Sequence, residues 1–408
     1  MPNKDRNIPK RRFKAFENAD AWELRRFSEL AEIRRGLTYS PTSIRKEGIR
    51  VLRSSNIDED TFTFGEDDVF VDKGVVKIPL VKEGDILITA ANGSSRLVGK
   101  HTIIKGLPAN STVHGGFMLL ASCRNPEFVN SLMSSEWYNK FISLYVAGGN
   151  GAIGNLNKND LDNQLVVVPS TSEQSAIGTF FSTLDQQITL HQRKLDKLKH
   201  VKQAYLSEMF PAEGERMPKR RFPGFTDAWE LQKLGEVGAV AMCRRIFKEQ
   251  TSEIGEIPFY KIGTFGGTPD AFISKELFEE YRNKYPYPTK GDILISASGS
   301  IGRTVEFLGK DEYFQDSNIV WLKHDGKIDN IFLKQFYSIV KWSGVEGSTI
   351  KRLYNENILN TEIALPSLLE QKAIGTFFST LDRQITLHQR KLEKLKNLKK
   401  ALLNELFV

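Results

Sequence analysis

The 408-residue sequence is poor in cysteine and histidine and has no long apolar runs. Its two cysteines, Cys123 and Cys243, form neither a disulfide framework nor a paired C-x-x-C zinc motif, and no H-E-x-x-H sequence occurs. No apolar run approaches the ~20 residues of a membrane-spanning helix, and none follows the basic N-terminus as in a signal peptide. We therefore expect a cytoplasmic protein with reduced cysteines and no bound metal.

Signatures of common enzymes are also missing. The sequence contains no G-x-x-x-x-G-K-[ST] phosphate loop and no G-x-S-x-G nucleophile elbow. Residues 149–154 fit G-x-G-x-x-G, but a loop-like sequence follows where the nucleotide fingerprint needs a helix, so we interpret them as a flexible loop. These absences predict a chain without a catalytic site or cofactor. Lysine and arginine outnumber acids by 57 to 50, an excess that permits nucleic-acid binding without demonstrating it.

The most informative feature is a long internal repeat. Residues 173–199 return at 370–396 with only three differences, Ser175/Lys372, Gln186/Arg383 and Asp196/Glu393. Apolar residues alternate four- and three-residue steps in each copy, which is the heptad pattern of a coiled-coil seam, with one histidine in register. Either each helix packs on its own domain or, as the narrow stripe favours, the two helices pair. The residues expected to serve helix pairing or partner docking are Ile177, Phe181, Leu184, Ile188, His191, Leu195, Ile374, Phe378, Leu381, Ile385, His388 and Leu392.

A second repeat opens each half of the chain. The sequence Pro-Lys-Arg-Arg-Phe at 9–13 returns at 218–222, and Asp-Ala-Trp-Glu-Leu occurs around both Trp22 and Trp229. We interpret the Lys-Arg-Arg runs as solvated basic linkers in preference to phosphate clamps. The two tryptophans are expected to be buried anchors where each globular part begins.

Between the repeats, short β-branched and aromatic runs separated by glycine, asparagine and proline indicate strands. Candidate strands are 69–80, 85–90, 102–105 and 165–168, and candidate helices are 126–144 and 330–342. We predict an α+β protein in which two strand-rich globular domains are separated by two long helices that pair as an antiparallel coiled coil, with an internal pseudo-twofold repeat. The predicted segments are a first domain at 1–172, a central helix at 173–215, a second domain at 216–369 and a C-terminal helix at 370–408.

Polar clusters at expected loop positions are the candidate binding residues. Arginine, asparagine and serine suit hydrogen bonding to base edges, and lysine or arginine suits phosphates. Ordinary turns are the alternative for any single residue, except that Arg96 and Arg303 share an offset of 207 residues with their surroundings and are expected to make contact. The candidate DNA-binding residues are Arg53, Ser54, Asn56, Asn92, Ser94, Arg96, Asn150, Asn155, Tyr260, Lys261, Thr264, Ser298, Ser300, Arg303, Lys351 and Arg352.

The order of these parts resembles the specificity subunit of type I restriction-modification systems. The resemblance covers nearly the whole chain and is carried by three pairs of segments: Gly84–Ile88 with Gly291–Ile295, Val168–Gln174 with Leu365–Gln371, and the two long helices. The order of the parts is more specific than any individual motif.

This resemblance implies two target-recognition domains, each reading one half of a bipartite, asymmetric sequence in double-stranded DNA. The paired helices would set the spacer and dock two modification subunits, which methylate adenine with S-adenosylmethionine. Restriction subunits that use ATP and Mg²⁺, and act as translocase and nuclease, would then join the complex. The chain itself would be non-catalytic and bind no cofactor.

Two other classes of function are weighed against this one. A coiled-coil scaffold or adaptor whose two domains bind proteins or glycans would show no DNA affinity with any partner. A fused enzyme would need a cluster of titratable residues shared by both halves, and the matched positions offer only the Glu-Gln motif and the seam histidines. The sequence favours the DNA-recognition subunit.

Overall fold

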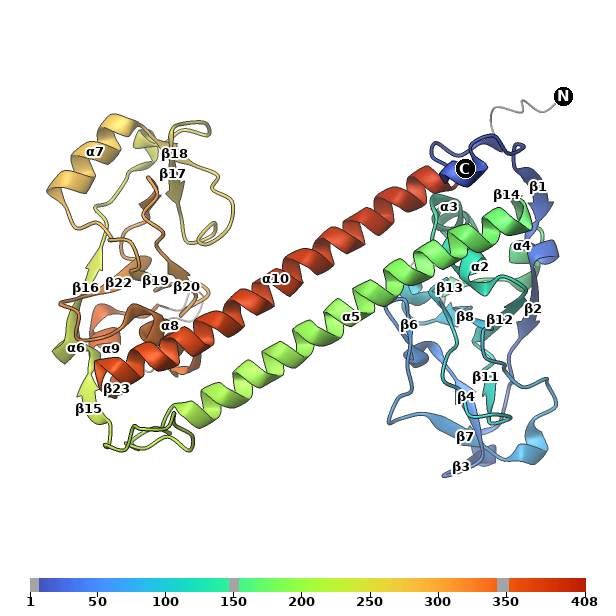
Figure 1. The fold of residues 1–408 in the computed structure, drawn as a ribbon, viewed down its shortest axis with the longest axis horizontal. Coiled ribbons are helices and arrows are strands. Elements are labelled where there is room, and N and C mark those ends of the chain that lie inside the picture. The colour runs from blue at the N-terminus through green and yellow to red at the C-terminus, as the bar shows by residue number, and fades with distance from the viewer. Residues whose placement is uncertain (1–6, 147–153, 343–351) are drawn as a thin grey trace. The chain divides into compact units, whose positions relative to one another are not determined.

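The computed structural model describes residues 7–146, 154–342 and 352–408. The chain divides into two compact units (Figure 1). Unit 1 contains residues 1–192 and 390–408, and unit 2 contains residues 193–389. Both units combine β-sheets with helices, which confirms the predicted α+β class.

Unit 1 is built on an antiparallel sheet in the order β10-β8-β12-β2. Its strands are β2 (Ala31–Arg35), β8 (Ile86–Thr89), β10 (His101–Ile103) and β12 (Met118–Cys123). A second sheet, β11-β4-β7-β3, contains β3 (Ile44–Arg45), β4 (Ile49–Leu52), β7 (Val69–Val71) and β11 (Thr112–His114). The short strands β1 (Glu23–Arg26) and β14 (Leu165–Val168) pair with each other. Apart from the long helices, the α-helices of unit 1 are α1 (Phe27–Leu30), α2 (Pro126–Met133), α3 (Glu136–Tyr145) and α4 (Lys158–Asp162) in the described residues.

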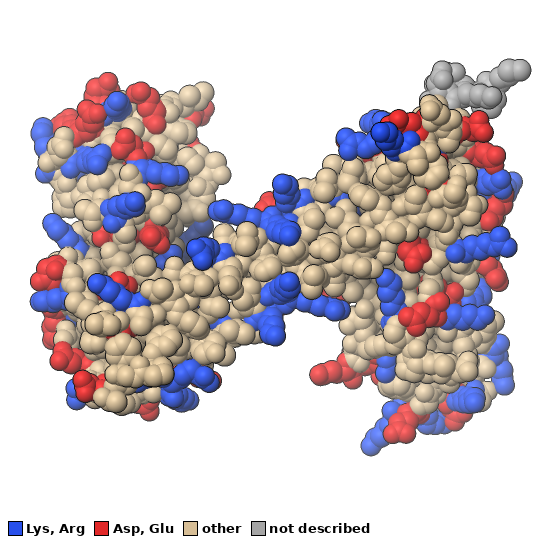
Figure 2. Space-filling model, in the orientation of Figure 1, with Lys and Arg blue, Asp and Glu red and all other residues tan. Residues whose placement is uncertain are grey.

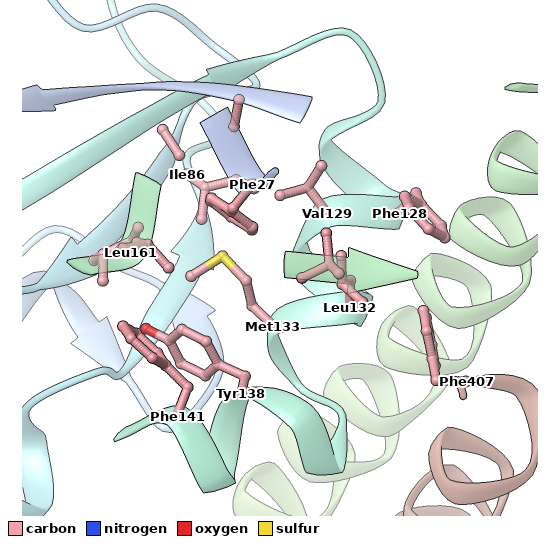
Figure 3. Packing of buried hydrophobic residues seen from close by; sticks show 14 of the residues in the cluster. Phe27, Ile86, Phe128, Val129, Leu132, Met133, Tyr138, Phe141, Leu161 and Phe407 are labelled. Carbon is pink, nitrogen blue, oxygen red and sulfur yellow. The ribbon is translucent and has the colours of Figure 1, made fainter. Parts of the chain in front are cut away.

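The core of unit 1 lies between the first sheet and the helices that follow it. Figure 3 shows Met133 and Phe141 from helices α2 and α3 facing Phe27 and Leu161, which come from distant parts of the chain. Trp22 is also buried in this cluster, with 3% of its surface exposed, so the expected anchor is confirmed.

Unit 2 repeats this plan. Its main sheet has the order β16-β22-β19-β20, formed by β16 (Gly238–Met242), β19 (Ile293–Ser296), β20 (Thr304–Glu306) and β22 (Ile319–His324). A smaller sheet contains β17 (Ile257–Tyr260), β18 (Phe272–Ile273) and β21 (Tyr313–Phe314), and β15 (Glu230–Lys233) pairs with β23 (Glu362–Leu365). The helices are α6 (Leu234–Val237), α7 (Lys275–Lys284), α8 (Asn330–Ile339) and α9 (Asn355–Leu359). Trp229 is fully buried, as expected.

Three predicted elements differ from expectation, and one of them is the helix predicted at 330–342, which ends at Ile339. The strand predicted at 69–80 ends at Val71, because the Asp72 carboxylate accepts a hydrogen bond from Gly74 N at 2.8 Å and starts a turn. The helix predicted at 126–144 is divided into α2 and α3. The hydroxyls of Ser134 and Ser135 donate to the carbonyls of Asn130 and Leu132, and these side chain–backbone bonds end α2.

The two repeated segments form helices α5 (Thr171–Met209) and α10 (Leu368–Leu406). In unit 1 the start of α5 packs against the end of α10, and Phe181 stacks on Phe407 with ring centroids 6.0 Å apart. In unit 2 the end of α5 packs against the start of α10, and the ring centroids of Phe210 and Phe378 lie 6.3 Å apart. Both contacts are antiparallel, so the predicted pairing of the helices is confirmed.

Most of the predicted seam residues are withdrawn from solvent. The buried ones are Ile177, Phe181, Leu184, His191, Leu195, Ile374, Phe378 and Leu392, and the partly buried ones are Ile188, Leu381, Ile385 and His388. The seam also merges with the cores of the units, because Ile177 and Phe181 belong to the cluster that contains Trp22. Each helix therefore packs both on its partner helix and on a globular domain.

The basic repeat that opens each half binds the long helices through its two arginines, and we call these contacts the helix clasp. The Arg12 guanidinium donates to both carboxylate oxygens of Glu173 at 2.9 and 2.5 Å, and Arg221 binds Glu370 in the same way at 2.8 and 2.6 Å. The exposed side-chain fractions are 6% and 2% for the first pair and 11% and 2% for the second, and the pKa of both arginines is raised, first of all by these hydrogen bonds. The interpretation as a solvated linker is therefore wrong for Arg12 and Arg221.

The preceding arginine of each repeat contacts the other long helix. Arg11 pairs with Glu405 at 3.0 Å in unit 1, and Arg220 pairs with Glu208 at 2.6 Å in unit 2. In both cases the backbone N–H of the arginine also donates to the backbone carbonyl of the same glutamate at 2.9 Å. Adjacent arginines thus hold the first turn of one long helix and the last turn of the other.

Gly178 allows α5 to approach the first turn of α2 closely. A Cβ atom at this position would lie 2.7 Å from Phe128 N and 3.1 Å from Glu127 C, both backbone atoms that cannot move aside freely. Gly375 has the same role in α10, where a Cβ would lie 3.1 Å from Phe332 N. Glycine weakens a helix, but at these two positions it permits close packing against a neighbouring helix.

Gly178→Ala is expected to destabilise the protein by about 1–3 kcal/mol, because overpacking forces backbone shifts. An open helix position would show the opposite sign, since alanine favours a helix over glycine by about 1 kcal/mol. Urea unfolding measures the difference. Thr179→Ala, at the exposed neighbouring position, serves as the control, and a more stable Gly178→Ala variant would contradict the close packing.

His114 makes the stability of unit 1 depend on pH. Burial lowers the pKa of His114 from its usual 6.5 to about 4, although its Nε2 lies 3.2 Å from the Arg34 carbonyl. As the pH falls below 6.5 the unfolded chain takes up the proton first, so stability is lost between about pH 6.5 and pH 4. The loss is on the order of 3 kcal/mol.

His114→Gln keeps a donor but cannot titrate in this range, so its stability should fall less than that of the wild type between pH 7 and pH 5. Urea unfolding at both pH values tests this expectation. Burial also lowers the pKa of His101, which therefore adds a contribution of the same sign to both proteins. Equal losses in the wild type and the variant would show that His114 is not the titrating group.

Candidate nucleic-acid interface

Most of the candidate loops meet at one edge of the main sheet in each unit. In unit 1 the antiparallel arrangement brings the ends of β2 and β8 beside the beginning of β12. The N–H groups of Ala90 and Ala91 both donate to the Phe117 carbonyl, at 2.9 and 3.0 Å. These bonds connect the loop after β8 to the turn before β12. The two segments therefore form one rigid loop edge.

The structure brings four of the predicted residues together at the unit 1 edge. The Asn92 amide donates to Ser54 Oγ at 3.0 Å, and its oxygen accepts from Ser94 N at 2.9 Å. Strand β9 (Ala91–Asn92) pairs with β13 (Gly154–Asn155), which places Asn155 at the same edge. Arg96 follows in an exposed turn at Ser95–Leu97.

Arg53 and Asn56 are engaged in the fold itself. Asn56 is fully buried; its oxygen accepts from Arg53 N at 2.8 Å, and its amide donates to Thr63 O at 3.1 Å and Asp68 Oδ1 at 2.8 Å. The Arg53 guanidinium binds Asp67. Because its polar atoms already have partners inside the protein, Asn56 is a structural residue. A DNA contact was predicted for it from the sequence.

Asn56→Ala is expected to lower the free energy of unfolding by about 1–3 kcal/mol, because it leaves buried polar groups without partners. Urea unfolding measures this loss. Ser94→Ala is the control, since this exposed side chain can be removed without breaking a buried hydrogen bond. An unchanged stability for Asn56→Ala would return Asn56 to the set of candidate DNA contacts.

In unit 2 the corresponding edge lies at the end of β19 and the beginning of β22. Ala297 N donates to the Asn318 carbonyl at 2.7 Å, and Ser298 Oγ donates to Asn318 Oδ1 at the same distance. A β-bridge joins Ser298 to Arg352, whose side chain is exposed. Ser300 is exposed in the following turn. The predicted residues Ser298, Ser300 and Arg352 therefore lie at the same loop edge of unit 2.

The other predicted segment of unit 2 lies against this edge. Gln315 connects the two, since its N–H donates to the Tyr260 carbonyl and its side chain accepts from Ile262 N, both at 2.9 Å. Lys261 pairs with Asp270 at 2.9 Å, and the Thr264 hydroxyl is engaged with the Lys261 backbone. Tyr260 stacks on Phe314 with centroids 5.8 Å apart.

Arg96 and Arg303 do not occupy equivalent positions, so the inference from their common offset is wrong. In unit 1 Thr89 exchanges hydrogen bonds with Gly99 and Lys100, and in unit 2 Ser296 does so with Gly302 and Arg303. The equivalent of Arg303 is therefore Lys100. The loop after β8 is longer than the loop after β19, so a constant offset fails beyond the strands. Asn150 and Lys351 lie outside the described residues.

Sequence reasoning missed several residues at these edges. Phe117 is 71% exposed, and Arg244 and Arg245 follow β16 after one intervening residue. Phe117 stands after a Gly-Gly pair, a turn signal that could have identified it, whereas the arginine pair gains meaning only from the sheet register. Exposed aromatic, amide, hydroxyl and guanidinium groups suit contacts with bases and phosphates.

Within residues 7–146, 154–342 and 352–408, no group of histidine, cysteine, aspartate and glutamate side chains could hold a metal ion. In the same ranges, no helix is long and apolar enough to cross a membrane. Burial raises the pKa of the Cys243 thiol to about 12, which keeps it protonated and unreactive near neutral pH.

Comparison with known proteins gives the family. The model of the type I restriction modification DNA specificity domain matches residues 19–200 and again residues 226–397. A putative type I restriction enzyme specificity subunit of Haemophilus influenzae is 58% identical over 158 residues, which are 38% of this chain and 41% of that relative. The putative type I restriction enzyme MjaX specificity subunit of Methanocaldococcus jannaschii is 24% identical over 95% of this chain and 93% of its own length.

A solved structure has the same fold. The S subunit of a type I restriction-modification system from M. genitalium aligns over 98% of this chain and 99% of its own, with a TM-score of 0.65 and 16% identity. The repeat of one sheet plan in two units agrees with the two family matches. With both halves matched, the chain belongs to the family of type I restriction-modification specificity subunits and carries two copies of its DNA specificity domain.

Proposed function

We propose that this chain is the DNA-recognition subunit of a type I restriction-modification complex and that each unit reads one half of a bipartite, asymmetric target. One observation carries this proposal: both units present the same sheet edge, but with different side chains. Asn92 and Ser54 meet at the edge of unit 1, whereas Ser298 and Asn318 meet at the edge of unit 2. A shared scaffold with unlike contact residues suits a target whose halves differ.

The chemistry of the edges fits base recognition. Asparagine can pair with adenine, arginine with guanine, and serine with several base edges in the major groove. Because its polar atoms are hydrogen-bonded inside the protein, Asn56 is excluded from the proposed DNA-binding residues. The others that the structure describes remain: Arg53, Ser54, Asn92, Ser94, Arg96, Asn155, Tyr260, Lys261, Thr264, Ser298, Ser300, Arg303 and Arg352. Asn150 and Lys351 remain predictions from the sequence.

The long helices suit a role as a spacer with two equivalent docking surfaces. Seam packing explains why buried positions are identical in the two copies, but exposed positions are identical as well. Leu190 and Leu387 are 44% and 63% exposed, although both are apolar. A repeated apolar residue on the surface fits two copies of one partner, because repeated surfaces recruit repeated partners. We assign that role to two methyltransferase subunits.

Attraction for the DNA backbone is the second contribution of the helices. Figure 2 shows that Lys and Arg predominate among the charged side chains over the long helices on the face in view. The excess of basic residues over the chain is +7, and phosphate neutralisation supplies much of the affinity in protein–DNA binding. We infer that the partner subunits complete the contact with the backbone.

The rest of the complex would carry the chemistry. We propose that this chain is non-catalytic, that the methyltransferase subunits use S-adenosylmethionine, and that restriction subunits use ATP and Mg²⁺. The proposed location of the complex is the cytoplasm. The family assignment does not favour the alternative of a scaffold that binds no DNA.

The proposal predicts a new methylation motif in cells that express this chain with its matched methyltransferase subunit. Base-resolution mapping of adenine methylation should find a split, asymmetric motif that disappears when the chain is deleted. Exchange of Trp22–Val168 for the corresponding segment of another family member should change one half of the motif and leave the other half intact. No new motif, despite an active methyltransferase subunit, would refute the proposal.

A further inference from the structure

An arginine of unit 2 is held in place at the loop edge that we assign to DNA recognition. Arg245 Nε donates to Asp316 Oδ2 at 2.8 Å. The Arg245 side chain is 60% exposed, whereas that of Asp316 is only 17% exposed. With the described residues, the Nη1 and Nη2 groups of Arg245 make no hydrogen bond. The carboxylate thus fixes one side of the guanidinium, and its terminal N–H groups remain available.

Asp316 belongs to the turn that is hydrogen-bonded to Ser298, one of the predicted contact residues. Asn318 N donates to the Asp316 carbonyl at 2.5 Å, and the Asn318 side chain accepts from Ser298 Oγ. Ser317 between them has a φ of 51°, a left-handed conformation that closes the turn. Arg245 is therefore attached to the same rigid turn as Ser298 and Asn318. Its guanidinium is preorganised beside them and not left on a flexible chain.

The surroundings of Arg245 form an open pocket of about 460 Å³. Arg244 lies over the Tyr285 ring, 5.1 Å from its centroid, in a cation–π contact that holds the second guanidinium. Phe247 and Tyr285 are 53% and 37% exposed. All of these residues, together with Asp316, line the pocket. Two oriented cations beside exposed rings make this surface suitable for a nucleic-acid base and its phosphate.

Unit 1 has no such pair at the equivalent place. The register of the sheets matches Arg35 with Met242 and Met118 with Ile319. Thr38 lies three residues after Arg35 in unit 1, and Arg245 lies three residues after Met242 in unit 2. The hydrogen bonds of the neighbouring strands match Gly115 with Gln315, so the turn before β22 is one residue longer than the turn before β12, where residues 115–117 include no acidic residue. Both members of the pair are therefore particular to the second unit, as expected for a residue that distinguishes the two half-sites.

We propose that Arg245 reads a guanine in the half-site of the second unit and that Asp316 is its positioning residue. This inference rests on the proposed function. Two parallel N–H groups of an arginine match the O6 and N7 acceptors of guanine in the major groove, the commonest specific contact between a protein and a base. An adenine offers a donor in place of O6 and is rejected. The carboxylate orients the fork so that little side-chain entropy is lost on binding.

The test uses the assembled complex of this chain with its methyltransferase subunits. Wild-type protein should methylate duplexes with guanine at one position of the second half-site about 10-fold or more faster than duplexes with any other base there. Arg245→Ala should reduce this preference to about 1-fold without changing the preference at any other position. Arg245→Lys should restore the preference only in part, because an ammonium group can donate to the guanine acceptors but lacks the planar fork. Asp316→Ala should weaken the preference in the same direction.

Arg220→Ala is a matched control. Arg220 is 54% exposed, pairs with Glu208 through Nε at 2.6 Å and lies 5.2 Å from the Tyr205 ring, but it belongs to the helix clasp. It should leave every base preference intact. A half-site without a G·C pair, or an Arg245→Ala complex that keeps its preference, would overturn this inference while the proposed function stands. A wild-type complex with no methylation motif at all would overturn both.

Discussion

The antiparallel contact between the ends of the two long helices completes the core of each unit. In unit 1 the last turns of α10 and the residue after them contribute Leu402, Leu403, Leu406 and Phe407 to the cluster that also contains Trp22. In unit 2 the last turns of α5 and the residue after them contribute Leu206, Met209 and Phe210 to the cluster that contains Trp229. The core of unit 1 therefore includes the end of α10 as well as the start of α5, and the core of unit 2 includes the end of α5 as well as the start of α10. The helices are part of the cores and not only a connection between domains.

Two repeated devices hold this contact in register. Gly178 and Gly375 let α2 and α8 approach the long helices, and the pairs Arg12–Glu173 and Arg221–Glu370 fix the segment that precedes each domain. Bidentate bonds satisfy these buried charges, and removing one partner of such a pair costs about 3–5 kcal/mol. Near-identity of the two halves at these positions follows from packing and desolvation. It does not need a shared ligand.

The loop edges are under a different constraint. Their backbones are fixed by main-chain bonds such as Ala90 to Phe117 and Ala297 to Asn318, which the two units share. Their side chains differ, because nothing in the core depends on them. Under the proposed function, a fixed frame with variable exposed groups would allow a new DNA sequence to be read without loss of stability. The Arg245–Asp316 pair illustrates this freedom, since unit 1 folds with Thr38 in place of Arg245 and with no acidic residue in the turn before β12.

The sequence alone determined the order of the parts, the long helices and their antiparallel seam, because the heptad spacing and the repeat are local patterns. It also identified most loops that meet at the edges, through their turn residues. Only the tertiary structure decided that Arg12 and Asn56 are structural, that Arg303 corresponds to Lys100, and that Arg245 meets Asp316. Each of these depends on partners distant in sequence and on strand register. A charge or an amide reads the same in a sequence whether it is buried against a carboxylate or exposed to DNA.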